Sequence, residues 1–276
     1  MFDFNKEHEY LVCIDSDGTV MDTMTIKHER AFGPAFIITY GINEHVDEIL
    51  NEWNRVNLYA RTRGINRFVG LKNIIEFVKK EYGYIFDGSQ EFFKWVDTTN
   101  ELSMRSLKKY FNECENVLGL EKAYAWSTNV NKIINTLPET NAFNGVSEAL
   151  FVLKDKVDLL GVSSANKEAV EEEWKRLGFY SYFKEVACQD KGTKKEIIAN
   201  GLKCGYQENK TIMLGDAVGD LEAAKKNNIW FFPIIPTKEG ECWKRFVNEG
   251  VEKLINNEFN QQYQDLLIKE FLDFLK

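Results

Sequence analysis

EYLVCIDSDGT, residues 9–19, is the stretch on which the fold prediction rests. An apolar run ends there in acidic, hydroxyl and glycine residues, a pattern typical of a buried strand that leads into a functional loop. The carboxylates of Asp15 and Asp17 can converge at the end of such a strand, and Gly18 permits the close backbone turn that a bound phosphate needs. Taken alone, DSDGT is explained equally well as an acidic turn that caps a helix.

Further apolar runs appear only after residue 150. They occupy residues 157–164, 183–189, 209–217 and 229–236, and helical patterns at 147–154, 167–178, 193–203 and 220–228 alternate with them. This alternation predicts an α/β fold with a parallel sheet covered by helices on both faces. Ligands of such sheets bind at the carboxyl ends of the strands, where the acidic residues of this chain lie.

Residues 21–143 follow a different pattern. Apolar residues recur there at helical spacing, without a convincing strand, over 28–41, 47–60, 68–83, 89–113 and 123–137. We therefore predict an all-helical domain at 21–143, inserted after the first strand and closed by the linker Pro138–Gly145. Residues 1–20 and 144–276 then form the α/β core domain, and the spacing of Leu, Phe and Tyr over 255–276 predicts a packed terminal helix.

A second acidic cluster, GDAVGD at residues 215–220, follows the apolar run TIML. Asp216 and Asp220 are explained locally as a turn residue and a helix N-cap. Two such clusters at strand ends, however, supply several carboxylate oxygens, which suits a hard cation such as Mg²⁺. The three histidines are scattered and zinc spacing is absent.

Two further residues could hold a phosphate. Ser163 ends the run VDLLGVS ahead of a helix, where backbone amides and the helix dipole attract anions, although a strand-end serine is more often a turn or N-cap residue. The stretch KGTKK, 191–195, offers a lysine at the start of the next helix. We favour Lys194, although any single lysine is usually a solvated charge.

In this order the four elements resemble the motifs of the haloacid dehalogenase superfamily: DSDGT, the strand-end serine, the lysine before a helix, and GDAVGD. The resemblance covers residues 9–236. It implies a three-layer, Rossmann-like parallel sheet with a helical cap domain. Many relatives have a proline after the lysine, and here Lys195 follows, so Lys191, Lys194 and Lys195 all stay open.

The resemblance also implies roles for single residues. Asp15 would attack the phosphoryl group and form an aspartyl-phosphate, while Asp17 would protonate the leaving oxygen and then activate water. Mg²⁺ would bind Asp15, Asp216 and the backbone carbonyl of Asp17.

The remaining motif residues would support that reaction. The resemblance implies that Asp220 supports the metal site from close by. Ser163, Lys194, Gly18 and Thr19 would contact the phosphate.

Three arginines stand close together in YARTRGINR, residues 59–67, of the predicted cap. Arg61, Arg63 and Arg67 could select a substrate through a carboxylate or a second phosphate, which arginine binds bidentately. The alternative interpretation is that the three arginines are solvated charges in a loop between helices.

Composition limits the classes of function. A net charge of −8 and a pI near 5.2 argue against a nucleic-acid binder. The apolar runs are too short to span a membrane, the charged start does not resemble a signal peptide, and five cysteines without a CxxC pair fit a reducing cytoplasm.

We therefore expect a magnesium-dependent phosphatase that acts on a small phosphorylated metabolite. A phosphomutase of the sugar-phosphate type would use the same core, and a non-catalytic ligand-binding protein is the alternative from another class. Asp17 argues against a haloacid dehalogenase, because that branch of the superfamily lacks the second aspartate.

Overall fold

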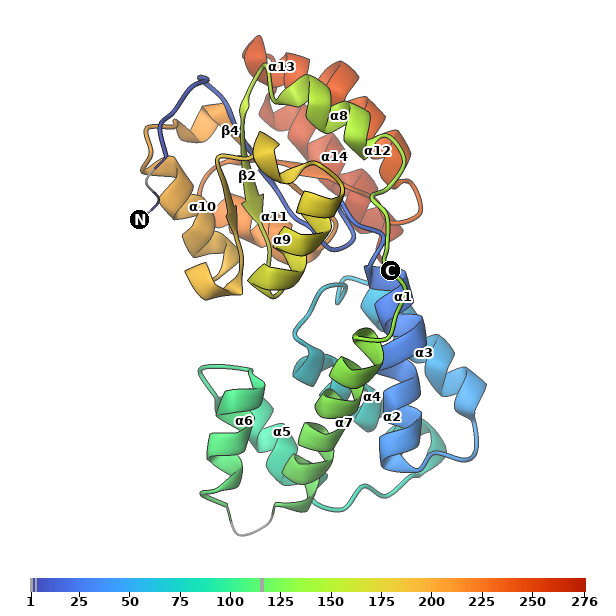
Figure 1. Ribbon diagram of the computed structural model, residues 1–276. Coiled ribbons are helices and arrows are strands. Elements are labelled where there is room, and N and C mark those ends of the chain that lie inside the picture. The colour runs from blue at the N-terminus through green and yellow to red at the C-terminus, as the bar shows by residue number, and fades with distance from the viewer. Residues whose placement is uncertain (1, 3, 115–116) are drawn as a thin grey trace. The chain divides into compact units, whose positions relative to one another are not determined.

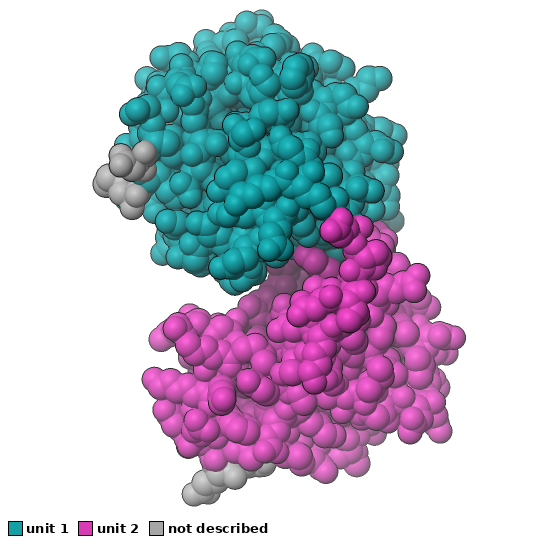
Figure 2. All heavy atoms as spheres, in the orientation of Figure 1, with its two compact units in different colours: residues 1–24, 140–276 teal, residues 25–139 magenta. Residues whose placement is uncertain are grey.

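The computed structural model describes residues 2, 4–114 and 117–276. The chain divides into two compact units, Met1–Met24 with Thr140–Lys276 and Thr25–Glu139 (Figure 2). The helical domain expected from the sequence, 21–143, extends slightly beyond the second unit at both ends.

The first unit is built on a five-stranded parallel sheet with strand order β3-β2-β1-β4-β5. The strands are β1 (Leu11–Ile14), β2 (Asp158–Val162), β3 (Glu185–Ala187), β4 (Thr211–Gly215) and β5 (Trp230–Pro233). Every residue of β1, β2 and β4 is buried, as expected when helices cover both faces. The predicted α/β fold with a parallel sheet is confirmed, and the first strand lies at the centre of the sheet.

Helices cover the two faces of this sheet (Figure 1). They are α8 (Val146–Leu153), α9 (Lys167–Arg176), α10 (Lys194–Leu202), α11 (Val218–Lys226), α12 (Glu239–Arg245), α13 (Val251–Ile255) and α14 (Gln261–Phe274). Val12 and Ile14 of β1 pack with buried residues of α8, α9 and α12. Leu11 and Cys13 pack with α10 and α11. Successive strand residues therefore supply two separate cores.

The helical stretch from α12 to α13 was not predicted. It contains a π-helical turn at Phe246–Gly250 between the two short helices. Trp243, Phe246, Val251 and Leu254 are buried along it. The sequence pattern did not indicate this stretch because it is divided into short helical pieces. In none of these pieces do apolar residues recur over enough positions to show helical spacing.

In the part of the second unit that the structure describes, every regular element is a helix. It begins within α1 (Met24–Lys27), whose first residue belongs to the first unit. It then contains the π-helical turn His28–Phe32, α2 (Gly33–Tyr40), α3 (Val46–Leu58), α4 (Arg67–Tyr82), α5 (Ser89–Thr98), α6 (Met104–Phe111) and α7 (Leu118–Ile134). Its core is rich in aromatic residues: Phe36, Trp53, Phe68, Trp95 and Trp126 are all buried. Among the described helices of the whole chain, none has the length and apolarity needed to cross a membrane.

The helical pattern predicted at 89–113 forms two helices, α5 and α6. Thr99 leaves the helical conformation, with φ −74° and ψ 144°. Ser103 then starts α6, because its side chain accepts a hydrogen bond from the amide of Ser106 at 3.1 Å. Serine is a preferred N-cap, so the boundary has a sequence signal, but apolar periodicity alone passes over it.

Candidate active site

The predicted site residues follow adjacent strands. Asp15 comes directly after β1, Ser163 directly after β2 and Asp216 directly after β4. Because β1 pairs with both β2 and β4 in parallel, the three loops leave the same edge of the sheet. Lys194, the first residue of α10, is held at its position by a capping box in which Thr193 and Glu196 bond to each other's backbone amides.

A cluster of carboxylates lies at this edge. Asp15, Asp216 and Asp220 each offer one oxygen, and these oxygens all lie within 4.8 Å of one another. The three residues are 5%, 2% and 0% exposed. Gly215 makes room for the cluster, since a Cβ at this position would lie 2.3 Å from Cγ of Asp220. The glycine of GDAVGD therefore lets the side chain of Asp220 fold back against the strand end.

Lys194 is the cation of this cluster. Its Nζ lies 2.8 Å from Oδ1 of Asp15 and 2.6 Å from Oδ1 of Asp220. Burial by itself would lower the pKa of Lys194, but the charges of Asp15 and Asp220 outweigh it and raise the pKa above its ordinary value. Lys191 and Lys195 are exposed. Of the three lysines that the sequence left open, Lys194 is the one that contacts Asp15.

The ion pairs recorded among the described residues bring one ammonium, that of Lys194, to a cluster of three carboxylates, so negative charge is in excess there. Burial raises the pKa of Asp15 well above its ordinary value; Lys194 opposes this rise, and the charges of Asp220 and Asp216 add to it. Burial raises the pKa of Asp220 in the same way. A buried, oxygen-rich and negatively charged set is what a hard divalent cation such as Mg²⁺ requires. The residues present therefore fit the metal.

The side chain of Asp17 has a hydrogen-bond partner in a nearby threonine. The hydroxyl of Thr23, which is 1% exposed, donates a hydrogen bond to Oδ1 of Asp17. The side chain of Asp17 is not a member of the carboxylate cluster. The resemblance implied a metal contact through its backbone carbonyl, not through its side chain. Sequence reasoning missed Thr23. The available signal was its position shortly after DSDGT, in the same loop.

Gly18, Thr19 and Ser163 already have partners. Gly18 has φ +82° and donates its amide to the carbonyl of Met21 at 2.9 Å. The hydroxyl of Thr19 donates to Oδ1 of Asp216 at 2.9 Å. Oγ of Ser163 accepts from the amide of Ala165 at 3.1 Å. In this structure the hydrogen bond of Gly18 therefore stabilises the loop, and that of Thr19 connects the loop to the acidic cluster.

The three arginines lie in the helical unit in different surroundings. Arg61 is exposed. Arg63 is 3% exposed and donates to the carbonyl of Leu58 at 2.8 Å. Arg67, at the start of α4, donates to Oγ of Ser127 at 3.1 Å and to Oδ1 of Asn131 at 2.7 Å. Burial lowers the pKa of Arg67.

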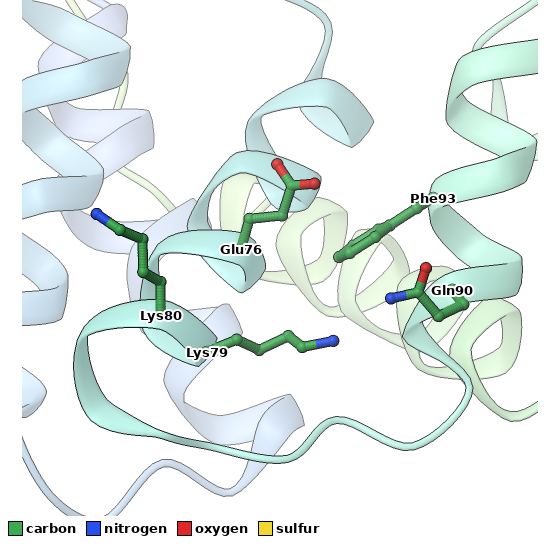
Figure 3. Close-up of a pocket in the computed structure, with 5 residues that line it drawn as sticks. All are labelled: Glu76, Lys79, Lys80, Gln90 and Phe93. Carbon is green, nitrogen blue, oxygen red and sulfur yellow. The ribbon is translucent and has the colours of Figure 1, made fainter.

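The helical unit also has a hollow of its own between α4 and α5. It is lined by Glu76, Lys79, Lys80, Gln90 and Phe93 (Figure 3). Lys79 donates to Oγ of Ser89 at 3.2 Å. This mixture of side chains carries no grouped nucleophile and base, so the strand-end cluster of the first unit is the candidate active site.

Known proteins were compared with the whole chain. The family model of haloacid dehalogenase-like hydrolases matches residues 65–234, which is more than half of the chain. No curated protein matches the sequence.

Solved structures that match this chain include three bacterial proteins. A phosphoglycolate phosphatase candidate from Lactobacillus delbrueckii subsp. bulgaricus has 16% identity and a TM-score of 0.49, and the match covers 82% of this chain and 86% of that one. A β-phosphoglucomutase candidate from Bacteroides vulgatus has 14% identity and a TM-score of 0.49, with 98% and 92% covered. A predicted phosphatase from Clostridium acetobutylicum has 14% identity and a TM-score of 0.48, with 89% and 100% covered.

Proposed function

The chain belongs to the haloacid dehalogenase-like hydrolases, and on that premise we propose that it is a magnesium-dependent phosphatase of a small phosphorylated metabolite. The supporting observation is the buried cluster of Asp15, Asp216 and Asp220 around Lys194. It combines a nucleophile, a set of oxygen ligands and a cation in one place. Phosphoryl transfer needs these three components.

Asp15 is the nucleophile in this proposal. One of its carboxylate oxygens attacks phosphorus, and the bond from phosphorus to the ester oxygen breaks. Asp17 gives its proton to the leaving oxygen, which departs as an alcohol. Asp17, now a carboxylate, takes a proton from water, whose oxygen attacks the phosphorus of the aspartyl-phosphate. Inorganic phosphate leaves, and Asp15 is again a carboxylate.

Charge has to be balanced for the first step. Two unit charges of like sign repel by about 4 kcal/mol at about 4 Å and an effective dielectric constant near 20. Mg²⁺, when bound by Asp15, Asp216 and the carbonyl of Asp17, with Asp220 beside them, would supply positive charge to the phosphoryl oxygens. Lys194 offsets the charge of Asp15 in the structure, and we propose that with Ser163 it also binds the phosphate.

We propose that the arginines of the helical unit select the substrate, and that Arg67 is the first of them to consider. In the part of the chain that the structure describes, its recorded hydrogen bonds go to neutral acceptors and no carboxylate pairs with it. A partly buried guanidinium without a counter-charge favours an anionic ligand. Arg67→Ala should raise KM for phosphate esters that carry a second anionic group more than for neutral esters. Equal increases for both would contradict the assignment.

A generic aryl phosphate with Mg²⁺ tests the reaction itself. The protein should hydrolyse it, lose activity with EDTA, and regain it when Mg²⁺ is restored. Asp15→Asn should lower kcat by at least about 10³-fold. Asp155→Asn, at an exposed aspartate before β2, is the control and should match the native protein.

Other outcomes of this assay separate the alternatives. Turnover that requires a sugar-bisphosphate activator would favour a phosphomutase. An Asp15→Asn variant with full activity would contradict the proposal. No turnover of any compound in a panel of phosphorylated metabolites would favour a non-catalytic binding protein.

A further inference from the structure

Two buried tryptophans donate hydrogen bonds to the loop that carries Asp15 and Asp17. Trp174, in α9, donates from Nε1 to Oγ of Ser16 at 3.1 Å. Trp243, in α12, donates from Nε1 to the carbonyl of Thr19 at 2.8 Å. Both tryptophans are 0% exposed. A buried indole N–H needs a partner, and here both partners belong to the catalytic loop.

The two tryptophans approach the loop from the same face of the sheet. They belong to one apolar cluster with Val12 and Ile14 of β1, whereas Leu11 and Cys13 belong to the cluster on the opposite face. Ser16 continues the even-numbered positions of β1, and its hydrogen bond with Trp174 lies on that face. The core that supports the sheet therefore also contacts the loop directly.

Ser16 is the central residue of the loop. Its carbonyl accepts hydrogen bonds from the amides of Thr19, Val20 and Met21 at 3.2, 2.9 and 3.0 Å. Its side chain accepts the fourth, from Trp174. Because Ser16 stands between Asp15 and Asp17 in the chain, a displacement of its backbone is passed on to the backbone of both aspartates.

Trp243 contacts the loop at a second residue, Thr19. It holds the carbonyl of Thr19, and the hydroxyl of the same threonine donates to Asp216 at 2.9 Å. The indole of Trp243 is thus linked through one residue to a carboxylate of the proposed metal site.

Strand β2 leaves space for the ring of Trp174. A Cβ at Gly161 would lie 3.0 Å from Cζ3 and 3.2 Å from Cη2 of this indole, closer than most side chains pack. The ring also packs on Phe183, with ring centres 4.5 Å apart. Trp174 is therefore fixed on several sides, as a group that positions another residue has to be.

We propose that Trp174 and Trp243 are positioning residues of this site: their indole N–H groups hold the loop from Ser16 to Thr19, and with it Asp15, Asp17 and Asp216, in the geometry for phosphoryl transfer. The inference rests on the proposed function for its chemistry, whereas the two hydrogen bonds can be measured without any reaction. Neither tryptophan lies in the four sequence motifs.

Kinetics of three variants test the proposal. Trp174→Phe removes the N–H and keeps an aromatic ring, and Ser16→Ala removes the acceptor and leaves the tryptophan in place. Each should lower kcat about tenfold, the factor that corresponds to one well-placed hydrogen bond, and change KM by less than about twofold. The double variant should be no slower than either single one, because both remove the same contact.

Trp230→Phe is the matched control. Its Nε1 donates to the carbonyl of Asn209 at 3.0 Å, away from the loop, so the same substitution there should leave kcat unchanged. Additive losses in the double variant, or an equal loss in Trp230→Phe, would overturn the proposal. If Trp174→Phe does not fold, Ser16→Ala and Gly161→Ala test the same contact with the indole retained.

Indole N–H signals in ¹⁵N NMR spectra supply a readout that does not depend on activity. Assigned from Trp→Phe variants, the Trp174 signal should shift in Ser16→Ala and the Trp230 signal should not. Unchanged signals would refute the hydrogen bond itself. A shifted signal with unchanged kcat in an active enzyme would refute the positioning role. An inactive native protein with the shifted signal would count against the phosphatase function instead.

Discussion

Lys194 is the residue on which the charge balance of the site depends. It is the one cation recorded in contact with Asp15 and Asp220 among the described residues, and its side chain is only 16% exposed. Lys194→Met keeps the length of the side chain and removes the charge. Breaking a buried ion pair in this way costs about 3 kcal/mol or more, so the free energy of unfolding should fall by about that amount in a metal-free buffer. Chemical denaturation measures it.

Activity and added metal distinguish this effect from simple damage to the core. Lys194→Met should lower kcat by about 10²-fold or more. Mg²⁺ should recover part of its stability, because a divalent cation can replace the missing charge. Lys195→Met, at the exposed neighbour, should behave as the native protein in both assays. Equal behaviour of the two variants would show that Lys194 is a surface charge.

The residues of the site differ in how far the sequence could predict them. Acidic groups at strand ends are visible because each follows its own apolar run, as Asp15 and Asp216 do. The tryptophans are not, since Trp174 is 158 positions from Ser16 and Trp243 is 224 positions from Thr19. Only the folded chain brings these pairs together, and a buried tryptophan is interpreted first as a core residue.

At the scale of elements, the start of α5 and the first turn of α7 touch through glycine backbones. A Cβ at Gly119 would lie 2.1 Å from the carbonyl oxygen of Gly88, so no side chain fits between them. Gly119→Ala should therefore separate the two helices and lower the free energy of unfolding by about 2 kcal/mol.

Gly219→Ala is the comparison for this prediction. Gly219 also lies near the start of a helix, but nothing stands within 4 Å of the position that a Cβ would take there. Alanine there should leave stability unchanged or raise it by less than about 1 kcal/mol. Equal effects of the two substitutions on denaturation would contradict the close contact between α5 and α7.

Strand β2 begins with a buried carboxylate that anchors the chain before β1. Asp158, 1% exposed, accepts hydrogen bonds from the amides of Glu7 and His8 at 2.8 Å, and from the hydroxyl of Tyr206. Burial alone would raise its pKa, but these hydrogen bonds outweigh burial and place the pKa of Asp158 below its ordinary value.

A lowered folded-state pKa makes stability depend on pH. The carboxylate of Asp158 stabilises the fold above its unfolded-state pKa of about 4, and this contribution is lost as the pH falls through the lower folded value. Asp158→Asn should cost about 2 kcal/mol at neutral pH. It should also flatten the decrease in unfolding free energy between about pH 5 and about pH 2. An unchanged slope would contradict the prediction.

At the scale of the whole molecule, the sequence predicted the kind of sheet but not the order of its strands. Alternating strands and helices require parallel pairing, and this was visible in the apolar runs. The central place of β1, between β2 and β4, depends on which strands pair across long stretches of chain. No local pattern in residues 9–19 specifies those partners.

Because β1 lies at the centre of the sheet, we expect the two units to differ in whether they fold as isolated fragments. Residues 25–139 are continuous and contain a complete aromatic core, so this fragment should fold alone, with a helical circular dichroism spectrum and a cooperative thermal transition. Residues 140–276 lack β1, which pairs with both β2 and β4 and supplies Leu11, Val12, Cys13 and Ile14 to the two cores. That fragment should not fold alone.

A peptide of residues 1–24 should restore the second fragment, because it returns the missing strand to its place between β2 and β4. The gain in ordered structure should saturate with peptide concentration. A control peptide with Val12 and Ile14 changed to serine should have no effect, since both side chains are 0% exposed in the core. Cooperative unfolding of 140–276 without any peptide would mean that β2 and β4 can pair without β1, and the strand order would then be dispensable for the fold.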